Sequence, residues 1–64
     1  MVLPGKYKTR CGKEIEVFRP INYDLRVNIE HQVWFDSLGT AFKLAPHMIP
    51  LKESAPDFDL GEKL

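Results

Sequence analysis

Apolar and polar side chains alternate along residues 25–35, which form the longest such pattern in the chain. The apolar positions are Leu25, Val27, Ile29, Val33 and Phe35, and His31 is the one interruption. A period of two places every second side chain on the same face of a β-strand. Because strands usually contain about five or six residues, we expect a tight turn near residues 30–31 that divides this segment into two strands.

The segment that follows predicts a hairpin. Asp36 provides a side-chain acceptor at the first turn position, and Gly39 can adopt the positive φ that the fourth position requires. This spacing is typical of a three-residue hairpin loop with a glycine bulge. The resulting register places Trp34 opposite Phe42, with Leu44 farther along the same face.

Residues 6–19 predict a second hairpin, for which two loop geometries can be compared. A two-residue loop at Cys11 and Gly12 would set apolar side chains opposite charged ones on both faces. With Gly12 as a bulge glycine, one face becomes apolar and the other carries cross-strand pairs of opposite charge, which favours this second register. It pairs Gly5 with Val17, Tyr7 with Ile15, Lys6 with Glu16 and Lys8 with Glu14.

The C-terminal third of the chain has a different character. Residues 46–51 are mostly apolar but are bracketed by Pro46 and Pro50, which fits either an extended edge strand or one 3-10 turn over an open end of the sheet. Residues 53–64 are rich in charge and show no sustained period. Since they hold few apolar groups to offset the entropy cost of ordering the backbone, we expect a mobile acidic tail there.

Together these elements predict a mostly β protein. Residues 1–52 are interpreted as a single small β domain, either a curled antiparallel sheet or an SH3-like barrel, with four or five strands built from the two hairpins. A chain of 64 residues buries only about 60% of the surface that its unfolded form exposes. Its stability should therefore be modest.

Charge and cysteine content narrow the classes of function. Nine basic and nine acidic residues cancel, but five of the basic residues precede residue 20 and four of the acidic ones follow residue 52. A single cysteine, Cys11, excludes an intrachain disulfide, and together with His31 and His47 it does not form a ligand set with metal-site spacing. We therefore expect a cytoplasmic protein that has no cofactor and no metal.

The chain also lacks the patterns that indicate catalysis or membrane insertion. It contains no glycine-rich phosphate loop, no paired carboxylates with a pocket pattern and no nucleophile with a base in triad order. No apolar run is long enough to span a bilayer. We expect neither enzymatic activity nor a membrane partner.

A further indication comes from short motifs. The first hairpin contains Tyr7, Thr9, Arg10, Gly12 and Ile15, and the later hairpin contains Trp34, Asp36 and Gly39. In these motifs residues 6–44 resemble small uncharacterised phage and prophage proteins, which begin Y-x-T-R-x-G-x-x-V and carry a later hairpin with Trp and Gly. The resemblance implies a viral or mobile-element origin, and it implies no activity because none is assigned to those proteins.

Two groups of side chains are candidate binding sites. Trp34, Phe42 and Leu44 share one sheet face and form either part of the core or an exposed partner-binding surface. A separate basic group would contact phosphates or an acidic partner, unless its charges are matched by the interleaved carboxylates of Glu14 and Glu16. This basic group comprises Lys6, Lys8, Arg10, Lys13 and Arg19.

Two hypotheses of function follow from these groups. The first is a small non-catalytic protein-binding module, such as a phage-encoded modulator or inhibitor of a host protein, or a small subunit of a complex. The second is a nucleic-acid-binding regulator that uses the basic first hairpin. The sequence does not indicate the oligomeric state.

Overall fold

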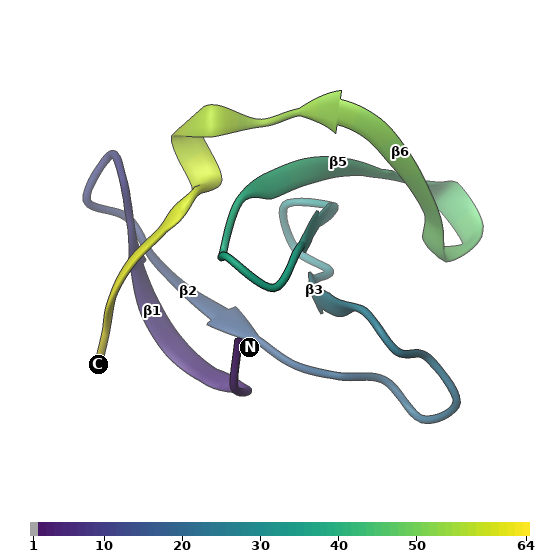
Figure 1. The fold of residues 1–64 in the computed structure, drawn as a ribbon, viewed down its shortest axis with the longest axis horizontal. Coiled ribbons are helices and arrows are strands. Elements are labelled where there is room, and N and C mark those ends of the chain that lie inside the picture. Colours follow the sequence, from purple (N-terminus) through teal and green to yellow (C-terminus); the bar gives the residue numbers. More distant parts are fainter. Residues whose placement is uncertain (1) are drawn as a thin grey trace.

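Residues 2–64, which the computed structural model describes, form seven strands and two single 3-10 turns (Figure 1). The strands are β1 (Gly5–Thr9), β2 (Glu14–Val17), β3 (Arg26–Asn28), β4 (Val33–Phe35), β5 (Ala41–Ala45), β6 (Ile49–Ser54) and β7 (Leu60–Lys63), and the turns are η1 (Pro46–Met48) and η2 (Pro56–Phe58). The expected mostly β class is confirmed.

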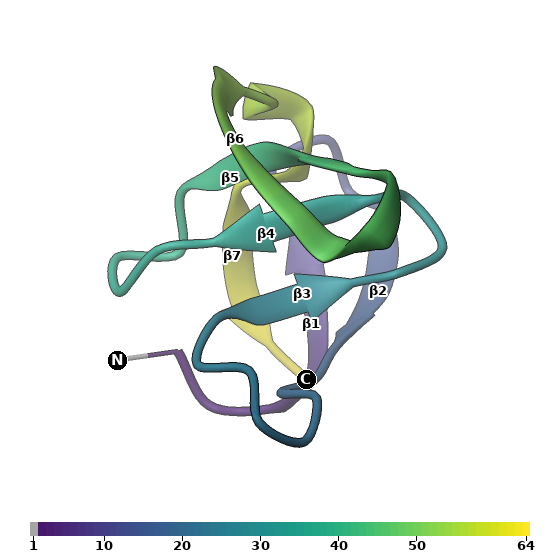
Figure 2. The ribbon, with the colours of Figure 1, turned by 90° about the vertical axis from the view of Figure 1, so that its right-hand side faces the viewer.

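The strands belong to two antiparallel sheets rather than to one barrel. The first sheet has the order β2-β1-β7 and the second has the order β3-β4-β5-β6. Figure 2 shows β3, β4 and β5 running across the direction of β1, β2 and β7. The expectation of a single curled sheet or an SH3-like barrel with four or five strands is wrong. The only backbone bridge between the β2 and β3 segments is that of Phe18 with Val27, and no continuous ladder closes the strands of residues 2–64.

Both hairpin registers that the sequence predicts are confirmed. In the first hairpin, the Gly12 N–H donates to the Thr9 carbonyl at 2.9 Å and Gly12 has φ +88°. In the second, Gly39 has φ +85° and its N–H donates to the Asp36 carbonyl at 3.1 Å. The observed pairs are Gly5 with Val17, Lys6 with Glu16, Tyr7 with Ile15, Lys8 with Glu14, Phe35 with Ala41 and Trp34 with Phe42.

The turn expected near residues 30–31 is also present. The Gln32 N–H donates to the Ile29 carbonyl at 3.2 Å, and the Asn28 side-chain oxygen accepts from the His31 N–H at 2.8 Å. One consequence differs from the prediction, because Ile29 lies in this turn and is 46% exposed, whereas Val27 is buried. The alternating pattern therefore assigns one apolar residue too many, Ile29, to the buried face of the strands.

The core lies between the two sheets and takes side chains from both. Tyr7, Ile15 and Val17 come from the first sheet, and Val33, Phe35 and Ala41 come from the second; Val2 completes the cluster. Ala55, Phe58 and Leu60 pack against this cluster from the C-terminal segment. The core is therefore built on the faces of β4 and β5 opposite to Trp34 and Phe42, since side chains alternate along a strand.

The expectation of a mobile tail over residues 53–64 is wrong. Strand β7 adds to the free edge of β1, where Tyr7 pairs with Lys63 and Thr9 pairs with Leu60. The Lys63 ammonium also lies 5.7 Å from the centre of the Tyr7 ring, which is a favourable cation–π arrangement. Backbone hydrogen bonds to β1 and burial of Phe58 and Leu60 supply the stabilisation that composition alone did not reveal.

The Pro-bracketed segment uses both of the conformations considered for it. Residues 46–48 form the turn η1, and the chain then extends into β6, which is the edge strand of the second sheet. The C-terminal half of β6 contains a register shift, because Phe42 pairs with Ser54 whereas Leu44 pairs with Pro50. Two more residues of β6 than of β5 lie between these pairs, so this part of β6 bulges away from β5.

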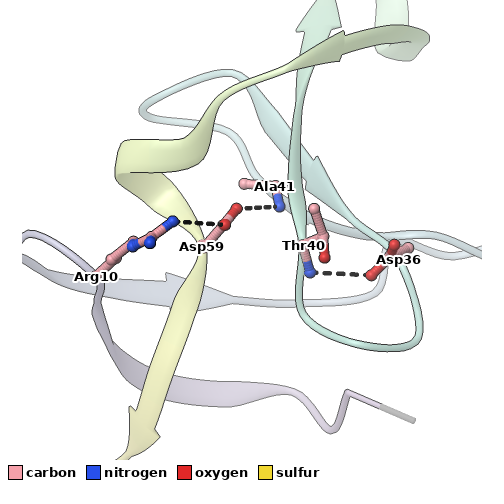
Figure 3. Close-up of polar contacts among 5 residues, drawn as sticks. All are labelled: Arg10, Asp36, Thr40, Ala41 and Asp59. Atoms are coloured by element: carbon pink, nitrogen blue, oxygen red, sulfur yellow. Dashed lines mark hydrogen bonds and ion pairs between the residues drawn. The ribbon is translucent and has the colours of Figure 1, made fainter.

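Asp59 joins the two sheets beside the loops of both hairpins (Figure 3). Its side-chain oxygen accepts from the N–H of the fully buried Ala41 at 2.8 Å, and its carbonyl accepts from the Arg10 N–H at 2.8 Å. The other carboxylate oxygen lies 3.8 Å from the Arg10 guanidinium, and the next residue, Leu60, donates its N–H to the Gly39 carbonyl. One residue thus connects η2, the first hairpin loop and the start of β5.

The opposite junction depends on Asn28 in the same way. The Asn28 side-chain N–H donates to the Glu16 carbonyl at 2.8 Å, next to the backbone bridge between Phe18 and Val27. Asn28 is 4% exposed, and its side-chain oxygen accepts from His31. Each junction between the sheets therefore combines backbone hydrogen bonds with one side chain of the Asp or Asn type.

The two bulge glycines provide a matched test of the loop geometry. We expect Gly12→Ala to destabilise the protein by about 1 kcal/mol, because a Cβ at positive φ is strained. Gly39→Ala should cost more, because its Cβ would lie 3.3 Å from the Leu60 Cβ, whereas a Cβ at Gly12 meets no atom within 4 Å. Urea denaturation measures both, with the exposed Ser37→Ala as a nearly neutral control. Equal stability of Gly12→Ala and the wild type would contradict the assignment.

Removal of the Asp59 carboxylate tests how much this junction between the sheets contributes to the free energy of unfolding. Asp59→Ala leaves the buried Ala41 N–H without its acceptor, so we expect a loss of about 1–3 kcal/mol in the free energy of unfolding. Asp59→Asn keeps a side-chain acceptor and should lose less. Arg10→Ala removes only an ion pair to an exposed guanidinium and should cost under about 1 kcal/mol. If Arg10→Ala proved as damaging as Asp59→Ala, the ion pair and not the hydrogen bond would be the main contact.

Candidate functional site

Trp34 and Phe42 form a stacked aromatic pair on the face of the second sheet that points away from the core. They lie opposite each other on β4 and β5, with ring centres 4.6 Å apart and ring planes inclined by 21°. Both side chains are half-buried. They are therefore neither enclosed in the core nor fully free, and we call this pair the aromatic face.

Strand β6 holds the aromatic face in place. The indole N–H of Trp34 donates to the Leu51 carbonyl at 2.8 Å, within the bulged part of β6. Next to this contact the Lys43 ammonium lies 2.6 Å from the Glu53 carboxylate, which ties the same bulge to β5. The ring of Trp34 is therefore fixed by both a stack and a hydrogen bond.

Leu44 lies beyond the aromatic face and is not available to a partner. It is 6% exposed, and its N–H donates to the Gln32 carbonyl at 2.8 Å. The turn η1 lies beside it, where the Tyr23 hydroxyl donates to the Met48 carbonyl at 2.7 Å. Partial burial raises the pKa of this hydroxyl, because the charged phenolate is disfavoured away from water, so Tyr23 remains a donor.

A groove of about 370 Å³ lies at the end of the second sheet. Most of its lining is apolar, and it includes the exposed Leu51 together with residues of the core. The lining residues are His31, Gln32, Val33, Lys43, Leu44, Ala45, Pro46, Leu51, Ala55 and Phe58. Sequence reasoning missed this groove because it assigned Phe58 to a mobile tail, and the signal that was available is the apolar pair of residues 58 and 60 within an acidic segment.

His31 belongs to the wall of this groove. Its ring centre lies 4.9 Å from that of Phe58, and its Nε2 atom lies 3.7 Å from the Glu30 carboxylate. His31 therefore connects the turn after β3 to η2.

The five basic candidates have four different surroundings. Lys6 and Lys8 lie on the outer face of β1, opposite Glu16 and Glu14. Arg10 contacts Asp59, and Arg19 contacts the exposed Asp24 at 3.5 Å. Lys13 is exposed at the end of the first hairpin loop, where its N–H donates to the Thr9 hydroxyl. Arg10 and Arg19 thus have carboxylate partners, whereas Lys6, Lys8 and Lys13 take part in no ion pair within residues 2–64.

Two further observations concern the chemistry of the surface. Within residues 2–64, no group of three or more His, Cys, Asp or Glu side chains is placed to hold a metal ion. Cys11 is exposed, with its sulfur 3.3 Å from the Thr9 hydroxyl. In the same part of the chain, no helix is long and apolar enough to cross a membrane.

The chain was compared with known proteins at the levels of sequence and fold. Comparisons with models of protein families, with curated proteins and with solved structures find no match.

Replacing the indole tests how the aromatic face is held. We expect Trp34→Phe to keep an aromatic stack on Phe42 but to lose the hydrogen bond to the Leu51 carbonyl, at a cost of about 1 kcal/mol. Amide hydrogen exchange should become faster over residues 51–53 and remain unchanged in β7. Tyr23→Phe is the matched control, because it removes a hydroxyl donor at η1 and should loosen residues 46–48 instead. Unchanged exchange over residues 51–53 in Trp34→Phe would show that the bulge is held by other contacts.

Proposed function

We propose that this chain is a small non-catalytic protein-binding module and that the aromatic face is its binding surface. The observation that carries the proposal is the half-buried, stacked pair of Trp34 and Phe42, fixed by the indole hydrogen bond to the Leu51 carbonyl. Tryptophan and other aromatic residues contribute most of the binding energy where they occupy the centre of an interface.

The surroundings of the aromatic face support the same proposal. The apolar groove at the end of the second sheet includes Leu51, whose carbonyl accepts the Trp34 indole N–H, and its lining suits one apolar side chain of a partner. Lys43 and Glu53 pair with each other at its border and give the interface a polar rim. The resemblance of residues 6–44 to phage proteins points to a cytoplasmic host protein as the partner, for which the chain would act as a modulator or inhibitor.

The nucleic-acid hypothesis receives less support from the contacts. Arg10 is engaged by Asp59, and Arg19 by Asp24. Lys6 and Lys8 alternate across the first hairpin with two carboxylates, which would repel a phosphate backbone. The strand β7 also brings the acidic C-terminal segment next to β1.

Binding measurements on surface variants test the proposal. A tagged chain captures the partner from a bacterial lysate, and the purified partner is then titrated by calorimetry. We expect Phe42→Ala to weaken binding by about 2 kcal/mol or more, which is roughly a thirtyfold loss of affinity. Lys8→Ala should cost under about 1 kcal/mol, because an exposed lysine affects the encounter rate more than the affinity.

The control variant is Ile21→Ala, which removes a 91% exposed apolar side chain that lies in neither groove and makes no contact with the aromatic face in the strand register. Thermal unfolding must first show that each variant is folded, because Phe42 is half-buried. A folded Phe42→Ala protein with full affinity would exclude the aromatic face. If Lys8→Ala lost affinity instead and binding to generic DNA or RNA fell steeply with salt, the nucleic-acid hypothesis would replace the proposal.

A further inference from the structure

A second groove, which includes neither Trp34 nor Phe42, lies between β2 and the turn after β3. Its volume is about 420 Å³. Phe18 and Ile29 line it and are 40% and 46% exposed. The complete lining is Lys6, Glu14, Ile15, Glu16, Phe18, Asn28, Ile29 and Glu30. Large apolar side chains left in contact with water beside a hollow are typical of an interaction site.

The wall formed by β2 has a free strand edge. β2 is the outermost strand of its sheet, with β1 as its only neighbour in residues 2–64 apart from the bridge at Phe18. Phe18 directs its N–H and carbonyl toward Val27, and the Glu16 carbonyl accepts from Asn28. In an antiparallel strand the backbone groups of every second residue point to the same side. The free edge of β2 therefore also receives the N–H groups of Glu14 and Glu16 and the carbonyl of Glu14.

The charge around the groove is strongly one-sided. Glu14, Glu16 and Glu30 contribute three carboxylates, and Lys6 is the one basic residue in the lining. Glu14 and Glu16 take part in no ion pair within residues 2–64, and Glu30 contacts only His31, which is charged only when protonated. Lys8 and Lys6 thus lie opposite Glu14 and Glu16 in the strand register but form no ion pair with them.

We propose that this groove binds an extended segment of a partner protein in which basic and apolar residues alternate. The segment adds as a strand to the free edge of β2, so that its backbone pairs with the outward groups of Glu14 and Glu16. Its basic side chains lie on the outer face beside these two carboxylates, and its apolar side chains lie on the opposite face beside Ile15 and Ile29, because side chains alternate along a strand. This groove includes neither Trp34 nor Phe42 and is therefore a different surface from the aromatic face.

The charge of the groove selects this occupant over others. An acidic segment or a nucleic acid would meet three carboxylates that no ion pair to a lysine or arginine neutralises. A purely apolar segment would leave those carboxylates partly desolvated without a partner, which is unfavourable. A second copy of the chain is disfavoured because the same edge on both copies would bring Glu14 and Glu16 against their own counterparts.

Peptide titrations followed by NMR test the proposal on the full chain. The probe is a blocked hexapeptide of alternating lysine and valine, and its counterpart is the same peptide with glutamate in place of lysine. We expect the lysine peptide to shift the amide resonances of Glu14, Glu16 and Ile29, and the glutamate peptide to shift none of them. A lysine peptide with alternate N-methylated backbone amides should bind at least tenfold more weakly, since it cannot complete the strand pairing.

Charge-matched variants locate the interaction. Glu14→Gln/Glu16→Gln should weaken binding of the lysine peptide at least tenfold. Asp57→Asn/Glu62→Gln removes the same charge outside the groove and should change the affinity by less than a factor of two. Phe42→Ala should retain peptide binding, which separates this proposal from the one for the aromatic face.

Three results would overturn the proposal. The first is equal binding of the lysine and glutamate peptides, and the second is a similar loss of affinity in the two charge-matched variants. The third is concentration-dependent dimerisation in sedimentation experiments that shifts the Glu14 and Ile29 amides without peptide, because a second copy would then occupy the groove.

Discussion

The fold depends on how two short sheets are joined at their edges. None of the strands exceeds six residues in the described chain, so neither sheet can bury its apolar face without the other. Asp59 joins them on one side by accepting the N–H of Ala41, and Asn28 joins them on the other by donating to the Glu16 carbonyl. At both places a short polar side chain satisfies a backbone group that a continuing strand would otherwise have paired.

The hairpins were predictable because their information is local. A glycine at the fourth loop position and an alternating pattern on either side define a loop and its register within a few residues. Comparison of the side chains that face each other in the two possible registers then selected the one that pairs Tyr7 with Ile15. The turn at residues 29–32 followed from strand length alone, although the exposure of Ile29 did not, since alternation cannot indicate which apolar residue a turn removes from the sheet.

The C-terminal segment was not predictable because its stabilisation is non-local. Its charged composition resembles that of a disordered tail, yet Leu60 pairs with Thr9, which lies 51 positions earlier (60 − 9). Phe58 and Leu60 are too few to form a core of their own, but they complete a core built by the rest of the chain. No local pattern in residues 53–64 indicates that the free edge of β1 is their partner.

For the candidate surfaces, the sequence predicted the aromatic pair but not its environment. The register fixed Trp34 opposite Phe42, whereas the burial of Leu44 and the coverage by β6 depend on how the Pro-bracketed segment returns over the sheet. The sequence left open whether the basic group is a binding surface or is matched by interleaved carboxylates; in the folded chain β7 brings Asp59 to Arg10, and Glu14 and Glu16 form no ion pair in residues 2–64. The first hairpin therefore carries at its loop an arginine that contacts Asp59, and on β2 two carboxylates without ion pairs in residues 2–64, and the contact with Asp59 depends on a residue far along the chain.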